Sequence, residues 1–222
     1  MPEPISNQEI RKRQEALHSK FADGDLLILC SSPETIHSND VHHPYRTQSN
    51  LLYLSGWTEP DAVMCSMKVN GKWQTHLFVQ PKDTLKEIWE GRRPGIEGAL
   101  ENWPVDYAHS VDDLQEKLAD FIAKSSKILH RMGIMPEVDE LVVKAVKKRD
   151  RARQRYGSGP ISIEDPSNLI AEMRLIKSES EIAQMKFASD VSSLAHIAAM
   201  KHGGGNNCLL YTSDAADDEE RV

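Results

Sequence analysis

The side chains of this sequence that could ligate a metal or act as a nucleophile are scattered along the chain. Of nine histidines, only His42 and His43 are adjacent, and neighbours in an extended segment face opposite ways. His196 lies four residues after Ser192 with no carboxylate at ligand spacing. The sequence has no Cys-x-x-Cys, His-Glu-x-x-His or paired-aspartate motif and no Gly-x-Ser-x-Gly nucleophile elbow. It therefore predicts no catalytic residue and no metal ligand set.

Arginines and a basic run are the other candidates for chemistry. Arg46, Arg92 and Arg93 stand in polar segments, where we expect them to anchor loops by pairing with carboxylates. The basic run 147–155 ends a predicted helix, where cations complement the helix dipole, and it lacks aromatic residues for base stacking. Together with a net charge of -7, this argues against nucleic acid as a partner.

Composition indicates a globular chain of 222 residues, with 39% hydrophobic and 27% charged residues. No stretch is apolar enough to span a bilayer, and the N-terminus has no basic segment followed by an apolar one, so we expect neither a membrane anchor nor a secretory signal. The three cysteines, Cys30, Cys65 and Cys208, lack metal-ligand spacing. We expect Cys30 and Cys65 to be buried reduced thiols, as in a cytosolic protein.

Helical and extended patterns alternate along the chain. Ser6 and Glu9 predict a capping box for a helix to about Ala22. Asn70-Gly71 predicts a hairpin turn. Apolar runs predict strands at 26–30, 51–54, 62–67, 73–79, 127–130 and 161–163. Helices are predicted at 111–124, at 138–148, after Pro166 and after Ser178, where Glu181 completes a second capping box.

Three motifs in order resemble the N-terminal half of the Xaa-Pro aminopeptidases (aminopeptidase P). The first reads Tyr45-Arg46, Ser49-Asn50, Tyr53-Leu54-Ser55-Gly56, Trp57 and Glu59-Pro60. The second is Glu87-Ile88-Trp89-Glu90-Gly91-Arg92-Arg93, and the third is Glu172-Met173-Arg174-Leu175-Ile176-Lys177-Ser178. The resemblance covers about the first two hundred residues.

The resemblance implies an α/β fold with a mixed sheet flanked by helices, followed by the first long helix of a truncated pita-bread metallopeptidase domain. It places the N-terminal domain at 1–172 and the linker with that helix at 173–207. It also implies a cytoplasmic, homo-oligomeric peptidase that removes an N-terminal residue preceding proline. Two manganese ions would lie in the second domain, held by aspartates, a histidine and glutamates. Those ligand motifs are not reached before residue 207, so we expect the fragment to be inactive and to bind no manganese.

Two residues are candidates for substrate binding on the same resemblance. In tetramers of the family, the tryptophan corresponding to Trp89 helps to wall a neighbouring subunit's substrate pocket. A flat indole suits packing against a proline ring, although a core or interface role for Trp89 remains the alternative. Arg153 matches a family arginine near the same entrance, in a region where the alignment can shift by a residue or two.

Residues 208–222 resemble translated sequencing adapter. The ten residues from Cys208 to Asp217 match, codon for codon, a transposase adapter read in frame. We therefore expect a non-native tail, the alternative being a genuine acidic C-terminus. Rival functions remain open: a peptidase-like binding module that has lost its metal ligands, or a relative that acts only on Xaa-Pro dipeptides or on creatine.

Overall fold

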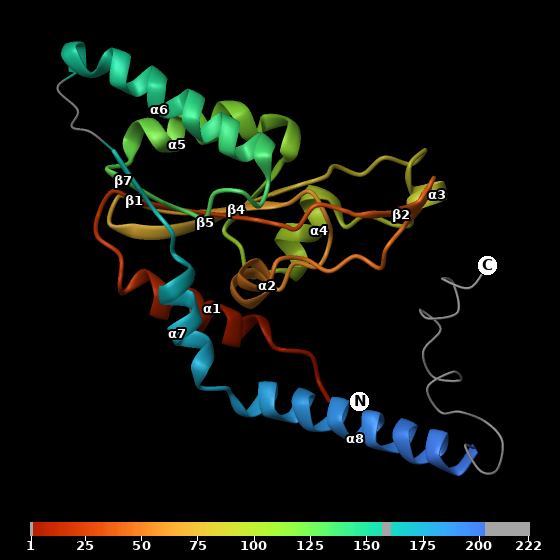
Figure 1. Ribbon diagram of the computed structural model, residues 1–222. Helices are drawn as coiled ribbons and strands as arrows, with labels where there is room; N and C mark the ends of the chain where they lie inside the picture. Colours follow the sequence, from red (N-terminus) through yellow and green to blue (C-terminus); the bar gives the residue numbers. More distant parts are fainter. Residues whose placement is uncertain (1, 157–160, 203–222) are drawn as a thin grey trace. The chain divides into compact units, whose positions relative to one another are not determined.

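The computed structural model describes residues 2–156 and 161–202, without the side chains of 90 and 152–156 (Figure 1). Two compact units divide the chain. Ser6–Leu175 form the larger unit, and Met1–Ile5 together with the residues from Ile176 onward form the other. The predicted tail at 208–222 lies outside the described residues.

One mixed six-stranded sheet is the framework of the larger unit. Its strands follow the order β6-β5-β4-β1-β7-β8. Their bounds are β1 (Asp25–Cys30), β4 (Val63–Val69), β5 (Lys72–Val79), β6 (Tyr107–Ser110), β7 (Lys127–His130) and β8 (Ser162–Glu164). β4 is antiparallel to β1 and β5, whereas the β1–β7, β5–β6 and β7–β8 pairs are parallel. Outside this sheet, β2 (Ile36–Ser38) and β3 (Val41–His42) pair as a short arm.

Helices cover both faces of the sheet (Figure 1). Those of the larger unit are α1 (Asn7–His18), α2 (Ser49–Ser55), α3 (Glu87–Glu90), α4 (Gly95–Asn102), α5 (Leu114–Lys124), α6 (Pro136–Tyr156) and α7 (Ser167–Leu175). A 3-10 turn, Val111–Asp113, precedes α5. The arrangement confirms the predicted fold class of a mixed sheet flanked by helices.

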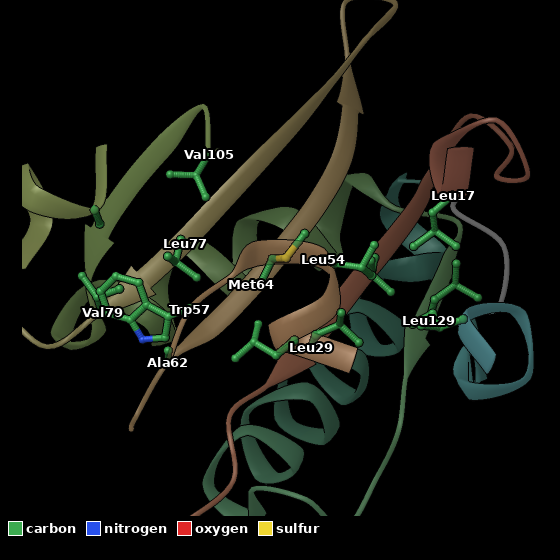
Figure 2. Packing of buried hydrophobic residues seen from close by; sticks show 14 residues of the cluster. Leu17, Leu29, Leu54, Trp57, Ala62, Met64, Leu77, Val79, Val105 and Leu129 are labelled. Atoms are coloured by element: carbon green, nitrogen blue, oxygen red, sulfur yellow. The ribbon is translucent and has the colours of Figure 1, made fainter. Parts of the chain in front are cut away.

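Alternation along β1 divides the apolar core in two. Leu27 and Leu29 face a cluster that includes residues of α1, α2, α4 and α7 (Figure 2). Leu26, Ile28 and Cys30 face a second cluster that includes residues of α5 and α6. Every residue of β1 is buried, as its continuous apolar run predicts for a strand covered on both faces.

Several local predictions are confirmed. The Ser6 hydroxyl accepts from the Glu9 N–H at the start of α1, and Asn70 and Gly71 form the β4–β5 turn with φ of 52° and 79°. Cys30 and Cys65 are buried free thiols. Burial raises the pKa of Cys30 to about 12 and also raises the pKa of Cys65.

The predicted strand at 51–54 is wrong, because these residues lie in helix α2. The Gln48 side chain accepts hydrogen bonds from the N–H groups of Asn50 and Leu51 and so begins the helix. Gly56, with φ of 71°, ends it, and its N–H donates to the Leu52 carbonyl. Leu51 and Leu54 are fully buried on one helical face. A four-residue apolar run fits either structure, and here the end caps and packing favour the helix.

Some predicted ends also differ. The helix predicted to reach about Ala22 stops at His18, and the one predicted at 138–148 runs over Pro136–Tyr156. In α6 the apolar periodicity covers only the part that packs on the sheet, and the charged remainder continues as helix beyond that contact.

The smaller unit consists mainly of helix α8 (Glu179–His202). The predicted capping box is confirmed at its start: the Ser178 hydroxyl accepts from the Glu181 N–H, and the Glu181 carboxylate accepts from the Ser178 N–H. No residue of α8 is buried, although Leu194 and Met200 are apolar. None of the described helices combines the length and apolar character needed to cross a membrane.

Candidate functional site

Trp89 lies on the short helix α3, and Asp83 holds the turn that precedes this helix. The Asp83 carboxylate accepts from the N–H groups of Leu85 and Lys86 at 3.0 and 3.3 Å. Gly91, with φ of 90°, follows the helix. The Trp89 side chain is 88% exposed, which excludes the core role that was left open for it. Its indole is presented to whatever lies outside this unit.

Large apolar side chains are exposed on the α3 segment and on the β2–β3 arm. Leu85 and Ile88 are 75% and 70% exposed on the same segment as Trp89. The β2–β3 arm adds Ile36 and Val41, which are also exposed. The arm and the segment after α3 are neighbours, because His42 of the arm and the residues that follow α3 line the same pocket. Such an exposed group of large apolar residues is typical of an interaction surface.

That pocket has a volume of about 190 Å³ and lies where the arm, the turn before β4, the end of β5 and the segment after α3 meet. Its lining residues combine two arginines, two glutamates, a buried indole and two prolines. They are Glu34, His42, Trp57, Glu59, Pro60, Gln80, Gly91, Arg92, Arg93 and Pro94. We call it the arm pocket.

Local contacts hold the polar walls of the arm pocket. His42 Nδ1 lies 3.7 Å from a Glu34 carboxylate oxygen, and the Gln80 amide donates to Asp61. The backbone N–H of Arg93 donates to the Glu87 carboxylate at 3.1 Å, and this hydrogen bond connects the pocket wall to α3. The position of Trp89 is therefore coupled to the pocket through the α3 segment.

The structure tests the predictions for two of the arginines, Arg46 and Arg92. Arg46 donates to the Ser49 hydroxyl at 3.1 Å rather than to a carboxylate. Within the described part of the chain, no carboxylate forms an ion pair with Arg46 or Arg92, so pairing is wrong for these two. The backbone of Arg153 lies in α6, but its side chain is outside the described residues.

A group of stacked rings lies on the sheet, and its pattern was not recognisable from sequence. His76 on β5 and His109 on β6 stack with centroids 5.3 Å apart, and His76 Nδ1 lies 3.0 Å from His109 Nε2. Burial, and secondarily the charge of His109, lowers the pKa of His76 to about 4. Burial also lowers the pKa of His109. The register of β5 and β6 makes these residues neighbours, and a single sequence does not give that register.

No metal ligand set forms from the residues that the structure describes. No group of three or more histidine, cysteine, aspartate or glutamate side chains is arranged to hold an ion. The adjacent imidazoles have different neighbours, since His42 lies beside Glu34 and His43 contacts His37 edge-on at 4.8 Å. The metal implied by the family resemblance does not fit these residues.

A larger cavity, of about 990 Å³, opens between α5 and α6. Acidic Asp112, Glu116 and Asp120 line it together with basic Lys144 and Lys148. Acidic side chains thus stand on one wall of this cavity and basic side chains on the other.

These observations define a class of protein: an α/β domain that presents an aromatic tip and a small polar pocket and that forms no metal or nucleophile site among its described residues. Residues 10–130 match the family described as aminopeptidase P, N-terminal domain. The chain belongs to this family.

Relatives and solved structures agree with that assignment. The chain is 31% identical over 201 residues to the Xaa-Pro aminopeptidase of Escherichia coli strain K12, covering 89% of this chain and 45% of that protein. It superposes on zinc-substituted E. coli aminopeptidase P in complex with product with a TM-score of 0.83 at 31% identity, covering 89% and 45% of the two chains. For proline aminopeptidase P II from Yersinia pestis the TM-score is 0.79 at 34% identity, with 88% and 45% covered. The chain thus spans less than half the length of these relatives.

Proposed function

We propose that this chain is the N-terminal part of a manganese-dependent Xaa-Pro aminopeptidase, which releases an N-terminal residue that precedes proline. The observation that carries the proposal is the agreement of sequence and fold with aminopeptidase P over 89% of the chain. The domains are those expected from sequence: an N-terminal domain at 1–172, a linker with the first helix of the catalytic domain at 173–207, and a non-native tail at 208–222. The compact unit Ser6–Leu175 supports a boundary in this region.

Helix α8 supports a catalytic domain that continues beyond this chain. Its apolar side chains, such as Met185, Leu194 and Met200, are 58%, 66% and 62% exposed. Burying such side chains is favourable by ~1.5–3 kcal/mol each, so a helix of this kind normally packs against a partner. We propose that the catalytic domain covers α8 and supplies the metal ligands.

Catalysis in this proposal belongs to that domain. Manganese bound in that domain would supply Lewis-acid chemistry for hydrolysis of the peptide bond. The residues of this chain do other work: they bind and orient the peptide and exclude water from it. The alignment of motifs and the exposed indole support Trp89 as a wall for the proline ring of a substrate held by a neighbouring subunit. Arg153 is proposed for the same entrance.

We also propose a homo-oligomer, because in this proposal the indole of Trp89 in one subunit lines the substrate pocket of another. The exposed apolar residues around α3 and on the β2–β3 arm support such a contact. We propose the cytoplasm as the compartment, which suits the free thiols of Cys30 and Cys65.

Reading the gene beyond codon 207 tests the proposal. We expect the frame to continue into aspartate, aspartate, histidine, glutamate and glutamate ligands, and the protein made from it to cleave an Xaa-Pro peptide when loaded with manganese. The purified 222-residue chain is expected to show no turnover and no tight manganese binding. Turnover by this chain would contradict the proposal, and a continuation without the ligand set would favour a binding module instead.

A further inference from the structure

The arm pocket contains a hydrogen-bond donor that the fold leaves unused. Trp57 is 2% exposed and lines the pocket. Its Nε1 is buried and has no hydrogen-bond partner among the described residues. Figure 2 shows the indole between Val79 and Ala62, with its nitrogen on the edge near Ala62. Glu59 and Pro60 line the same pocket as Trp57. A buried N–H without an acceptor destabilises the fold, and an acceptor that enters the pocket would remove this cost.

The rest of the core does not supply this acceptor. Trp103 packs against Trp57 with centroids 4.7 Å apart, but its own indole N–H donates to the Gly56 carbonyl at 3.0 Å. The indole N–H of the partly buried Trp103 therefore has an acceptor, whereas that of the buried Trp57 has none among the described residues. Because the Trp57 N–H is covered, a ligand reaches it only when one of the lining side chains turns aside.

The charges around the pocket select the class of ligand. Arg92 has no ion-pair partner in the described chain and favours an acceptor. Among the described residues, the Glu59 carboxylate accepts a hydrogen bond only from the Thr58 hydroxyl, at 3.3 Å, and keeps acceptor capacity for a further donor. A small anion would be repelled by Glu59, and a small cation would be repelled by Arg92. A neutral group that both accepts and donates, flanked by the apolar faces of Pro60 and Pro94, fits both walls.

A peptide backbone amide is such a group, and the size and place of the pocket suit it. A volume of about 190 Å³ corresponds to roughly six water molecules at ~30 Å³ each. Arg92 is three residues from Trp89, so their Cα atoms are at most ~11 Å apart at ~3.8 Å per residue. A peptide in contact with Trp89 therefore reaches the pocket within about three residues.

We propose that the arm pocket binds a backbone amide of the substrate peptide, one to three residues on the carboxyl side of its proline. The Trp57 N–H donates to the carbonyl oxygen of this amide, and the Glu59 carboxylate accepts from its N–H. This inference rests on the proposed function for the identity of the peptide, while the pocket and its unused donor are features of this chain.

The test is an NMR titration of the ¹⁵N-labelled 222-residue chain with acetyl-Gly-Gly-Gly-amide. The chain has four tryptophans, so four indole N–H signals are resolved and assigned from triple-resonance spectra. We expect the Trp57 signal to shift saturably while the Trp73 signal stays in place. Sodium acetate and methylammonium chloride, tested separately, are expected to leave the Trp57 signal unchanged. The probe has no free amino group, so the result does not depend on whether the longer protein is an aminopeptidase.

Removing the Glu59 charge tests whether the pocket binds a peptide amide or an anion. Glu59→Ala removes the acceptor and is expected to raise the Kd of the peptide about tenfold, whereas Glu15→Ala, an exposed glutamate on α1, leaves it unchanged. An anion pocket would bind acetate and would bind it more tightly in E59A. That result, or an unmoved Trp57 signal at the solubility limit of the peptide, would overturn the proposal.

Discussion

Trp89 and Trp57 differ in exposure although both stand in family motifs. Trp89 is 88% exposed on α3, whereas Trp57 is 2% exposed in the core. The residues that precede each tryptophan in the sequence do not predict this difference in exposure. Trp89 contributes nothing to the core of this unit, so a substitution of Trp89 can change function without changing stability.

Replacing Trp89 by alanine is expected to leave the free energy of unfolding of the 222-residue chain within ~0.5 kcal/mol of the unchanged chain. In the longer protein, the loss of a flat apolar wall against proline is worth ~1.5–3 kcal/mol, so kcat/KM for an Xaa-Pro peptide should fall by about 10- to 100-fold. Urea unfolding and steady-state kinetics measure the two quantities.

Ile88→Ala is the matched control for that variant, since Ile88 is the preceding residue on α3 and is 70% exposed. It should preserve most of kcat/KM, and Trp89→Phe should recover much of it, because phenylalanine retains an aromatic face. Unchanged kinetics in W89A would remove Trp89 from the substrate pocket.

At the scale of elements, α2 shows how a helix replaces an expected strand. Its seven residues are too few for a stable isolated helix, so its ends and its packing decide its structure. Gly56 takes a left-handed conformation at the C-terminal end, and a Cβ there would lie 2.9 Å from Ile10 Cδ1 on α1. The end of α2 and its contact with α1 therefore depend on the same glycine.

Gly56→Ala is expected to lower the free energy of unfolding by ~2 kcal/mol, from the left-handed φ and from the displacement of Ile10. Gly71→Ala is the control: its φ is 79°, but no atom lies within 4 Å of an added Cβ. That variant should cost only the backbone term, ~1 kcal/mol. Equal losses in the two variants, measured by urea unfolding, would show that the contact with Ile10 is unimportant.

At the scale of the whole molecule, buried histidines connect stability to pH. Burial lowers the pKa of His18 and of His76 to about 4 from 6.5. His18 stacks on Trp73 and faces the charges of Asp106 and Arg11, while His76 faces His109, Asp106 and Lys117. Both imidazoles are neutral in the folded chain at pH 7.

Because the folded pKa values lie below the unfolded ones, the unfolded chain binds more protons between pH 6.5 and 4. The stability that the neutral histidines contribute is complete above pH 6.5. As the pH falls from 6.5 toward 4, each of them lowers the free energy of unfolding by ~1.4 kcal/mol per pH unit. Urea unfolding at pH 7, 6 and 5 measures this slope.

His76→Gln is expected to reduce the slope by ~1.4 kcal/mol per pH unit, whatever its effect on stability at pH 7. His196→Gln provides the control, since His196 is exposed on α8. If H76Q keeps the full slope, the lowered pKa of His76 is not responsible for it.

Features held by near neighbours in the chain were determined by the sequence alone. The capping residues Ser6 and Ser178 and the Asn70-Gly71 turn satisfy backbone groups a few residues away, so their residue types suffice. The three motifs gave the family in the same way, because their spacing is written in the chain.

Only the tertiary structure decided which distant residues meet. Trp57 shares a pocket with Gln80 and Arg92, and His76 stacks on His109, because turns and strand register bring them together. The helix at α2 depends likewise on packing against α1 and the sheet. Such contacts arise from the simultaneous burial of apolar surface from many elements, which no local pattern in one sequence specifies.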